Sequence, residues 1–341
     1  MKLLIITQKV DREDDILGFF HHWVEKFSEK LEKLYVVCLW QGEYHLPDNV
    51  EVFSLGKEEG FSKPYQLFRL QKFLFKHLSE VDGIFVHMCP IYAILSFLLV
   101  KIFRKKMILW YVHKSVNWKL KLAEKCVDKI LTASEESCRL KNRKKIEIVG
   151  HGIDIDQFIP RPTPSDKFRI LSVGRIAPVK NLETFIRAIG ILVNQKNIKD
   201  IRVKIIGWPI LTSDRKYFEK IKNLVREKKL ENYIEFLGSI PHQKMPEYYQ
   251  QNDLLISASE TGSFDKAVLE AMACGNFVLT PNEAFKEILE ERYLFKKRDS
   301  EDLAKKIINL KEFTIDKNLR EIVIKNHNLD NLIERIISNF K

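Results

Sequence analysis

Two cationic residues that follow a glycine in the second half of the chain are spaced so that both could bind the same anion. A strand-like run over 169–173 is followed by Gly174 and Arg175, and Lys180 lies five residues after Arg175, where a helical pattern begins. A guanidinium binds phosphate oxygens through paired hydrogen bonds, whereas an ammonium acts as a point charge. Arg175 and Lys180 could therefore hold a diphosphate from two sides. Two ordinary surface cations are the alternative that the spacing alone leaves open.

A second segment, 257–275, places a carboxylate on an apolar helix that follows a small, glycine-containing loop. The loop holds Gly262, Ser263 and Phe264, and the helical pattern after it ends at Gly275. Loop amides and a helix N-terminus together form an anion site. Glu270 lies in the helix among alanine, valine, leucine and methionine, where a carboxylate is costly to bury without partners. Ribose hydroxyls would be suitable partners, and a structural ion pair or an exposed helix edge is the alternative.

These residues belong to a chain that alternates short apolar runs with helical patterns. In the first half the runs lie at 3–7, 34–39, 50–55, 83–86, 107–112, 129–132 and 146–149, with helical patterns at 17–33, 65–79 and 91–103. After the proline-rich stretch 160–164 the runs lie at 169–173, 202–206, 234–237, 254–258 and 277–280, with helical patterns at 181–195, 212–229, 242–251 and 265–274. Continuous apolar strands that alternate with helices predict parallel, doubly wound α/β sheets. Two such domains predict a cleft at the carboxyl ends of their strands, where ligands bind.

Length and composition limit the class of protein. A chain of 341 residues suits two domains, and 45% apolar residues suffice for a core in each. No uncharged apolar run reaches the roughly 18 residues that a membrane span requires. The N-terminal residues enter a strand pattern directly and show no small-residue cleavage site, so we expect no signal peptide. Five scattered cysteines without a C-x-x-C pair fit free thiols in a reducing cytosol.

Positive charge is concentrated in one stretch of the first half. Residues 61–145 contain 18 lysine and arginine residues against six acidic ones, and the rest of the chain sums to −1. Such a stretch attracts anionic lipid headgroups, phosphorylated acceptors or nucleic acid, and a solvated lysine-rich face is the alternative.

The segment 257–275 resembles the signature of the retaining family-4 glycosyltransferases, in which two glutamates lie eight positions apart. The second glutamate matches Glu270, and the resemblance implies that it binds the donor ribose. The first falls at Gly262, where this chain departs from the pattern, and the nearest carboxylates are Glu260 and Asp265. We expect Asp265, at the start of the helix, to contact the transferred sugar in preference to Glu260. A simple N-cap role is the alternative for Asp265.

Further matches extend the resemblance along the chain. Gly174, Arg175 and Lys180 match the diphosphate clamp of the family. Residues 150–158 resemble its interdomain linker, and 236–241 resemble the strand and loop whose backbone meets the nucleotide base, which places Ile240 in the site. Two histidines, His87 and His113, follow strand patterns in the first half, and a lone histidine is usually structural. The family has a histidine near the reacting sugar at the position of His113. Gly18 matches the second glycine of a loop that approaches the donor phosphate.

The resemblance implies an α/β protein of the GT-B class, with two Rossmann-like doubly wound domains and a cleft between them. We expect an N-terminal, acceptor-side domain over 1–160, completed by a C-terminal helix over 328–341, and a nucleotide-sugar-binding domain over 165–327. The implied enzyme is a retaining glycosyltransferase, without cofactor or metal, that moves a sugar from a nucleotide-sugar donor to a glycan or lipid-linked acceptor. Its expected role is in cell-envelope glycan or glycolipid synthesis.

The expected location is the cytoplasm. The basic stretch adds the further expectation that the protein attaches peripherally to the inner face of an anionic membrane. A nucleotide-sugar epimerase shares the GT-B fold and remains an alternative, as does a non-catalytic nucleotide-sugar binder. A nucleic-acid-binding protein would explain the basic stretch but not the combination of Arg175, Lys180 and Glu270, so no nucleic acid is expected as a partner.

Overall fold

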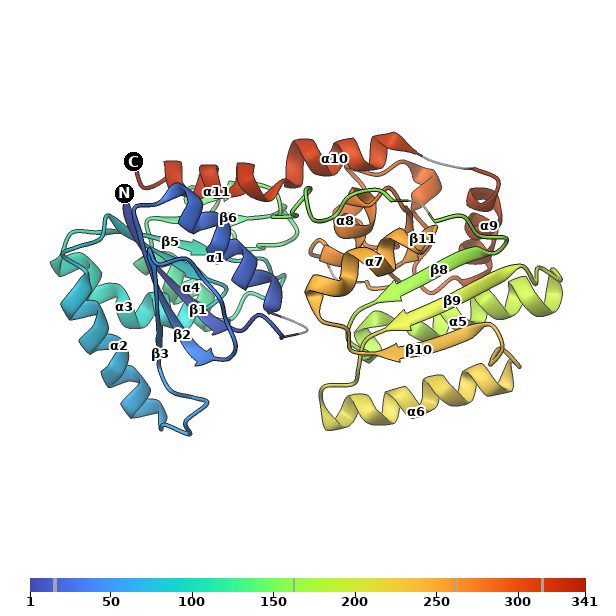
Figure 1. Cartoon of the computed structure of the whole chain (residues 1–341), viewed down its shortest axis with the longest axis horizontal. Helices are drawn as coiled ribbons and strands as arrows, with labels where there is room; N and C mark the ends of the chain where they lie inside the picture. Colours follow the sequence, from blue (N-terminus) through green and yellow to red (C-terminus); the bar gives the residue numbers. More distant parts are fainter. Residues whose placement is uncertain (15–16, 162, 261, 314–315) are drawn as a thin grey trace. The chain divides into compact units, whose positions relative to one another are not determined.

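The computed structural model describes residues 1–341 apart from 15–16, 162, 261 and 314–315. The chain divides into two compact units. The first comprises Met1–Gly152, Pro241–Gln243 and Leu329–Lys341, and the second comprises Ile153–Ile240 and Lys244–Asn328. Each unit has its own parallel sheet and its own covering helices (Figure 1). Within the described residues, no helix is both long enough and apolar enough to span a membrane.

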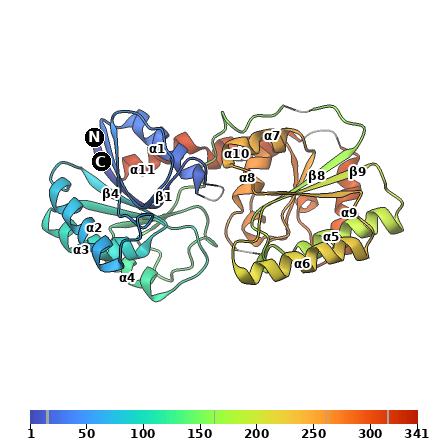
Figure 2. The ribbon, with the colours of Figure 1, turned by 60° about the horizontal axis from the view of Figure 1, so that its bottom comes forward.

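The first unit is built on a seven-stranded parallel sheet with the strand order β3-β2-β1-β4-β5-β6-β7 in the described part of the chain. The strands are β1 Lys2–Val10, β2 Lys33–Gln41, β3 Val50–Ser54, β4 Gly83–His87, β5 Lys106–Trp110, β6 Lys129–Thr132 and β7 Ile146–Ile148. The helices are α1 Gly18–Lys30, α2 Lys63–His77, α3 Pro90–Ile102, α4 Trp118–Cys126 and α11 Leu329–Ser338. Helices α1 and α11 cover one face of the sheet, and α2, α3 and α4 cover the other (Figure 2).

Burial on both faces explains the continuous apolar runs in the sequence. Every residue of β4 is buried, because helices cover both sides of the strand. The layer of α2, α3 and α4 packs Leu70, Leu74 and Ala123 against the sheet. The sequence patterns did not include α4, whose N-cap Asn117 accepts a hydrogen bond from the Leu120 amide.

The second unit has a five-stranded parallel sheet with the order β10-β9-β8-β11-β12 in the residues described. Its strands are β8 Phe168–Val173, β9 Ile201–Ile206, β10 Ile234–Gly238, β11 Leu254–Ile256 and β12 Phe277–Leu279. Its helices are α5 Leu182–Gly190, which continues into a π-helical turn over Ile191–Gln195, α6 Thr212–Glu227, α7 Met245–Gln250, α8 Lys266–Ala273, α9 Ser300–Lys311 and α10 Lys317–His327.

The strand order of the second unit has a switch point between β8 and β11. From β8 the chain proceeds outward through β9 to β10, and then returns to pair β11 on the other side of β8. In open α/β sheets ligands bind outside the carboxyl ends of the strands at such a point. Gly174 and Arg175 follow β8, and Ser257 follows β11, so the topology brings the two sequence motifs of the second half together.

The boundary between the units lies earlier than the sequence analysis placed it. Residues 153–160, expected in the first domain, belong to the second unit. The Ile153 amide donates to the carbonyl of His327, and the Arg320 guanidinium donates to the carbonyls of Ile155 and Phe158. These bonds tie the segment to α10, so the proline-rich stretch 160–164 does not mark the boundary.

The C-terminal helix belongs to the first unit. Lys30 of α1 and Glu334 of α11 form an ion pair with an N–O distance of 2.8 Å. The Phe340 ring fills the space that a side chain at position 83 would need, which is why Gly83 suits this position. The last 13 residues, Leu329–Lys341, are therefore part of the structure that surrounds the seven-stranded sheet.

Candidate functional site

Two glycine turns bring the ends of β8 and β9 into close contact. Gly174 has a φ of 139° and Gly207 a φ of 141°, both in the region that L side chains rarely adopt. A Cβ atom at position 207 would lie 2.0 Å from the Gly174 carbonyl oxygen. A Cβ atom at position 174 would lie 3.0 Å from Cε of Lys180. Glycine at these two positions therefore lets the Lys180 side chain lie against the turn that carries Arg175.

Arg175 stands at the carboxyl edge of the sheet with much of its side chain in solvent. Its Nε lies 3.7 Å from Asp214 Oδ2, and the Asp214 side chain is buried in the first turn of α6. The same carboxylate accepts a hydrogen bond from the Leu211 amide. Asp214 thus orients the guanidinium from one side, while 41% of the Arg175 side chain stays accessible to an anion.

Lys180 and Asp265, both predicted for the site, form an ion pair with each other. Lys180 Nζ donates to Asp265 Oδ2 at 2.7 Å, and Ser257 Oγ donates to the same oxygen at 2.7 Å. Burial raises the pKa of Asp265, but the charge and hydrogen bond of Lys180 and the hydrogen bond of Ser257 outweigh it, so the pKa falls below its ordinary value of 3.8. Asp265 is also the N-cap residue of α8, so the residue that precedes the helix is the one that pairs with Lys180.

Glu260, the other candidate for the missing carboxylate, has different partners. It accepts a hydrogen bond from Arg298 Nε at 2.9 Å and one from Asn181 Nδ2 at 3.4 Å. Its neighbour Thr261 lies outside the described residues. Of the two carboxylates, Asp265 is therefore the one joined directly to the Lys180 cation.

The loop before α8 is anchored by its aromatic residue. Gly262 is buried, and the Ser263 carbonyl accepts a hydrogen bond from Asn282 Nδ2 at 2.7 Å. The Phe264 ring packs edge-on against Phe285, with centroids 5.0 Å apart. The ring of Phe264 is thus a core anchor, so a ligand contact at this residue would involve its backbone.

Glu270 is buried, and its protein partners include Tyr249 and Lys266. Tyr249 donates its hydroxyl to Glu270 Oε2 at 2.8 Å, and Lys266 Nζ lies 3.7 Å from Oε1. Burial lowers the pKa of Lys266 to about 8, although Glu270 and Asp154 oppose the shift. Burial also raises the pKa of Tyr249, with the Glu270 charge and hydrogen bond adding to it. Neither partner was predicted from the sequence: Lys266 has the i,i+4 spacing of a helical ion pair, whereas Tyr249 has no local signal.

The loops after β9 and β10 lie beside the Arg175 turn. The Gly207 amide donates to the Gly238 carbonyl at 2.8 Å, and the Ile176 amide donates to the Trp208 carbonyl at 3.3 Å. Ile240, predicted to lie near the base, follows in the second of these loops and is half-buried. Trp208 is 52% exposed and leans edge-on against Phe218 of α6. The sequence analysis did not single out this tryptophan.

The predicted residues of the first half lie in the first unit. His113 follows β5, is exposed, and accepts a hydrogen bond from the Ser115 amide at its Nδ1. Gly18 begins α1, where an added Cβ would lie 3.1 Å from the Arg12 carbonyl oxygen. His87 is instead buried and stacks on Phe20 with centroids 3.9 Å apart, which is a structural role.

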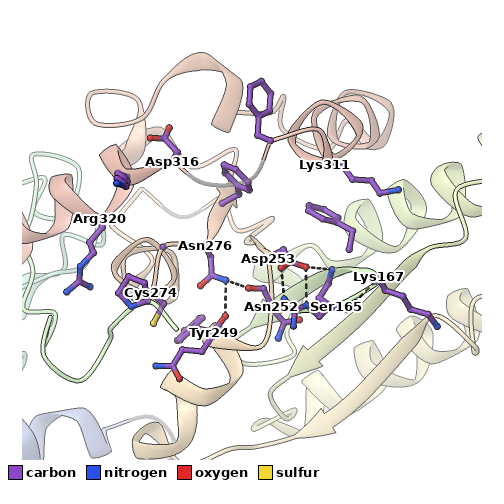
Figure 3. A pocket seen from close by; sticks show the side chains of 18 of the residues that line it. Ser165, Lys167, Tyr249, Asn252, Asp253, Cys274, Asn276, Lys311, Asp316 and Arg320 are labelled. Carbon is purple, nitrogen blue, oxygen red and sulfur yellow. Dashed lines mark hydrogen bonds and ion pairs between the residues drawn. The ribbon is translucent and has the colours of Figure 1, made fainter. Parts of the chain in front are cut away.

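A cavity of about 600 Å³ opens at the other edge of the second sheet, at the amino ends of β8, β11 and β12 (Figure 3). Arg169 and Asp253 pair there through bonds of 2.7 and 3.1 Å, and Asn276 donates to the Tyr249 carbonyl at 2.8 Å. None of the residues predicted for the site lines this cavity. Among the described side chains, no group of three or more His, Cys, Asp and Glu residues is arranged to hold a metal ion.

Comparison with known proteins adds curated relatives for part of the chain. Over 147 residues it is 27% identical to the D-inositol 3-phosphate glycosyltransferase of Kineococcus radiotolerans, covering 40% of this chain and 34% of that protein. Over 143 residues it is 26% identical to a subunit of the phosphatidylinositol N-acetylglucosaminyltransferase of Saccharomyces cerevisiae, covering 40% of this chain and 30% of that protein. The matched part thus spans about a third of the length of these relatives.

Solved structures share the fold along nearly the whole chain. Anabaena HepE in complex with UDP has a TM-score of 0.80 and 18% identity, covering 99% of each chain. The sucrose-phosphate synthase of Thermosynechococcus elongatus has a TM-score of 0.76 and 16% identity, covering 99% of this chain and 98% of that one. These similarities confirm the predicted fold class, two Rossmann-like domains of the GT-B type.

The family model described as glycosyl transferases group 1 matches residues 154–330. This match covers more than half of the chain and contains the Arg175 turn, the Lys180–Asp265 pair and Glu270. The chain belongs to the glycosyl transferases group 1.

Proposed function

We propose that the protein is a retaining glycosyltransferase, of the family-4 type, that moves a sugar from a nucleotide-sugar donor to an acceptor hydroxyl. The observation that carries the proposal is the arrangement at the switch point of the second sheet. There Arg175 is held at one glycine turn, and the Lys180 side chain lies against the same turn. Two adjacent cations at the carboxyl edge of a parallel sheet suit a diphosphate.

In the proposed reaction the bond between the sugar and the nucleoside diphosphate breaks, and negative charge grows on the leaving diphosphate. Arg175 and Lys180 stabilise this charge, which is the largest contribution that these residues can make. The acceptor hydroxyl attacks the anomeric carbon from the face that the diphosphate leaves and gives its proton to the departing phosphate oxygen, so the anomeric configuration is retained. No covalent nucleophile on the protein and no metal ion are needed in this scheme.

The other residues have assigned parts in the proposal. Glu270 accepts hydrogen bonds from the donor ribose in addition to that of Tyr249, and the loops at Trp208 and Ile240 receive the base. Asp265 holds Lys180 in place and accepts a sugar hydroxyl. His113 lies near the reacting sugar. The family membership supports these roles, and the structurally similar HepE has been solved in complex with UDP and with UDP-glucose.

The proposed acceptor is a glycan or a lipid-linked molecule of the cell envelope, handled at the cytoplasmic side of the membrane. This part rests on the basic stretch 61–145 and on the curated relatives, whose names refer to inositol phosphate and phosphatidylinositol. Peripheral attachment to an anionic membrane is included in the proposal.

Product analysis tests the proposal against its enzymatic alternative. Incubation with a nucleotide sugar and an acceptor extract should release nucleoside diphosphate only when acceptor is present, and NMR of the product should show the donor's anomeric configuration. Conversion of the nucleotide sugar into its epimer without acceptor would favour an epimerase. An inverted anomer would remove the retaining assignment.

A further inference from the structure

Three neighbouring helices of the first unit expose large apolar side chains. Helix α2 exposes Phe68 and Phe75, at 58% and 68%. Helix α3 exposes Leu98 and Ile102, at 68% and 63%, and α4 exposes Trp118 and Leu122, at 64% and 40%. Scattered exposed apolar residues are ordinary, but a contiguous group on one layer of helices indicates a binding surface.

The spacing of these residues places them on the outer side of the layer. Phe68 and Phe75 are seven residues apart, and the pairs on α3 and α4 are four apart, so each pair lies on one side of its helix. The opposite sides of the helices are buried against the sheet. Helix α2 packs on α3 and α3 packs on α4 (Figures 1 and 2). The Phe75 and Phe103 ring centroids are 6.1 Å apart.

Exposed cations surround the apolar residues. They are Lys63, Lys72 and Lys76 on α2, Lys101 on α3, and Lys119, Lys121 and Lys125 on α4. The three helices contain one acidic residue, Glu124, which is half-buried. Lys101 has a counter-charge in Asp128 at 3.8 Å, but the face as a whole is strongly positive.

The combination of exposed aliphatic side chains and surrounding lysines indicates which kind of partner this face can bind. A nucleic acid would be attracted by the lysines, but it offers no apolar layer for Leu98 and Ile102. An anionic bilayer offers both, because headgroup phosphates lie directly above an apolar interior. Tryptophan and lysine are also well suited to the boundary between the two, where an apolar body and a polar or charged end are both satisfied.

We propose that the outer side of α2, α3 and α4 is a docking face that lies on anionic lipid bilayers. Phe68, Phe75, Leu98, Ile102, Trp118 and Leu122 enter the region between the headgroups and the acyl chains, and the lysines contact headgroup phosphates. The inference deepens the proposed function by naming the partner surface. It rests on that function only for the nature of the acceptor.

Vesicle binding of the full chain tests the docking face. The parent should sediment with vesicles of phosphatidylcholine and phosphatidylglycerol and much less with phosphatidylcholine alone. Lys72→Gln, Lys101→Gln and Lys121→Gln combined should lower the partition coefficient roughly 100-fold, from about 1 kcal/mol per lysine. Phe75→Ser, Leu98→Ser and Trp118→Ser combined should abolish the binding that survives at high salt.

A matched control uses three exposed apolar residues elsewhere on the chain. Tyr44→Ser, Ile148→Ser and Phe313→Ser combined should bind vesicles like the parent. Trp118 emission should shift to shorter wavelength on anionic vesicles, and the shift should be absent in Trp118→Phe. Nucleotide affinity and thermal midpoint, measured on every variant, separate a failure of this face from a failure of the proposed function or of folding.

Several outcomes would overturn the docking face. Equal partitioning into neutral and anionic vesicles would do so, as would unchanged binding in both triple variants of the face. If the protein binds heparin but its Trp118 emission does not shift on vesicles, the lysines of this face serve to bind a soluble polyanion and not a membrane. A concentration-dependent dimer that the apolar triple variant abolishes, without vesicle binding, would assign the face to a second copy of the chain.

Discussion

Lys180 Nζ and Asp265 Oδ2 are 2.7 Å apart at the switch point of the second sheet, and Ser257 donates to the same carboxylate oxygen. The cation proposed to bind the donor diphosphate is therefore held by a carboxylate of the protein. A diphosphate arriving at Lys180 adds to this pair or displaces Asp265 from it. Either way, Asp265 sets the starting position of the ammonium.

Asp265→Asn should lower the free energy of unfolding by about 1.5–3 kcal/mol, because it removes a charge-assisted hydrogen bond. Helix capping alone would predict no loss, since Asn caps about as well as Asp. Chemical denaturation at pH 7 measures the difference, and the double variant with Lys180→Gln should recover part of it. Equal stability of the parent and Asp265→Asn would contradict the ionic role.

The same pair predicts a pH dependence of stability. The pKa of Asp265 is lower in the folded chain than its ordinary 3.8, so its contribution to stability is present above that value and is lost as the pH falls through the folded pKa. On acidification below about pH 4, the parent should lose more stability than Asp265→Asn. Parallel curves of unfolding free energy against pH for the two proteins would argue against this linkage.

Arg175→Ala and Lys180→Ala should each weaken nucleoside diphosphate binding roughly 10- to 150-fold, because each removes a charge-assisted contact of about 1.5–3 kcal/mol. Isothermal titration gives the dissociation constants. Arg202→Ala is a matched control, because Arg202 lies on β9 and pairs with Glu235 on the surface. A loss as large in the control as in the two site variants would indicate a general effect of charge.

Glu270→Gln should remove discrimination between ribose and deoxyribose nucleotides. If Glu270 accepts the ribose 2′-hydroxyl, the parent binds the ribonucleoside diphosphate that it prefers more tightly than its 2′-deoxy counterpart, and the variant binds both with similar affinity. Tyr249→Phe provides the control, since it removes a protein hydrogen-bond donor to the same carboxylate. A preference for the ribonucleotide that is unchanged in Glu270→Gln would leave Glu270 with a structural role alone.

Much of the fold could be predicted from the sequence because burial on both sheet faces makes each strand a continuous apolar run. The pairing of Lys180 with Asp265 could not, because the two residues are 85 positions apart and meet only through the β8–β11 neighbourhood. The Tyr249 partner of Glu270 was missed because the two residues lie on separate helices, α7 and α8, and meet only when these helices pack together. The domain boundary was misplaced because prolines indicate a linker, whereas the bonds of Arg320 to backbone carbonyls decide where the segment packs.

Transfer should persist in the presence of EDTA, because Arg175 and Lys180 supply the positive charge that a metal ion would otherwise bring to the leaving diphosphate. The rate of nucleoside diphosphate release with and without chelator measures this. Activity that disappears with EDTA and returns with magnesium or manganese would show that the two cations do not suffice.

The most direct test of the central claim is a thermal-shift panel of UDP-, GDP-, ADP- and dTDP-sugars on the parent and on the Arg175→Ala, Lys180→Ala double variant. One donor at about 100 times its dissociation constant should stabilise the parent by about 2.7 kcal/mol, and the double variant should show little stabilisation. Absence of stabilisation by every nucleotide sugar, or equal stabilisation of both proteins, would contradict donor binding at this site.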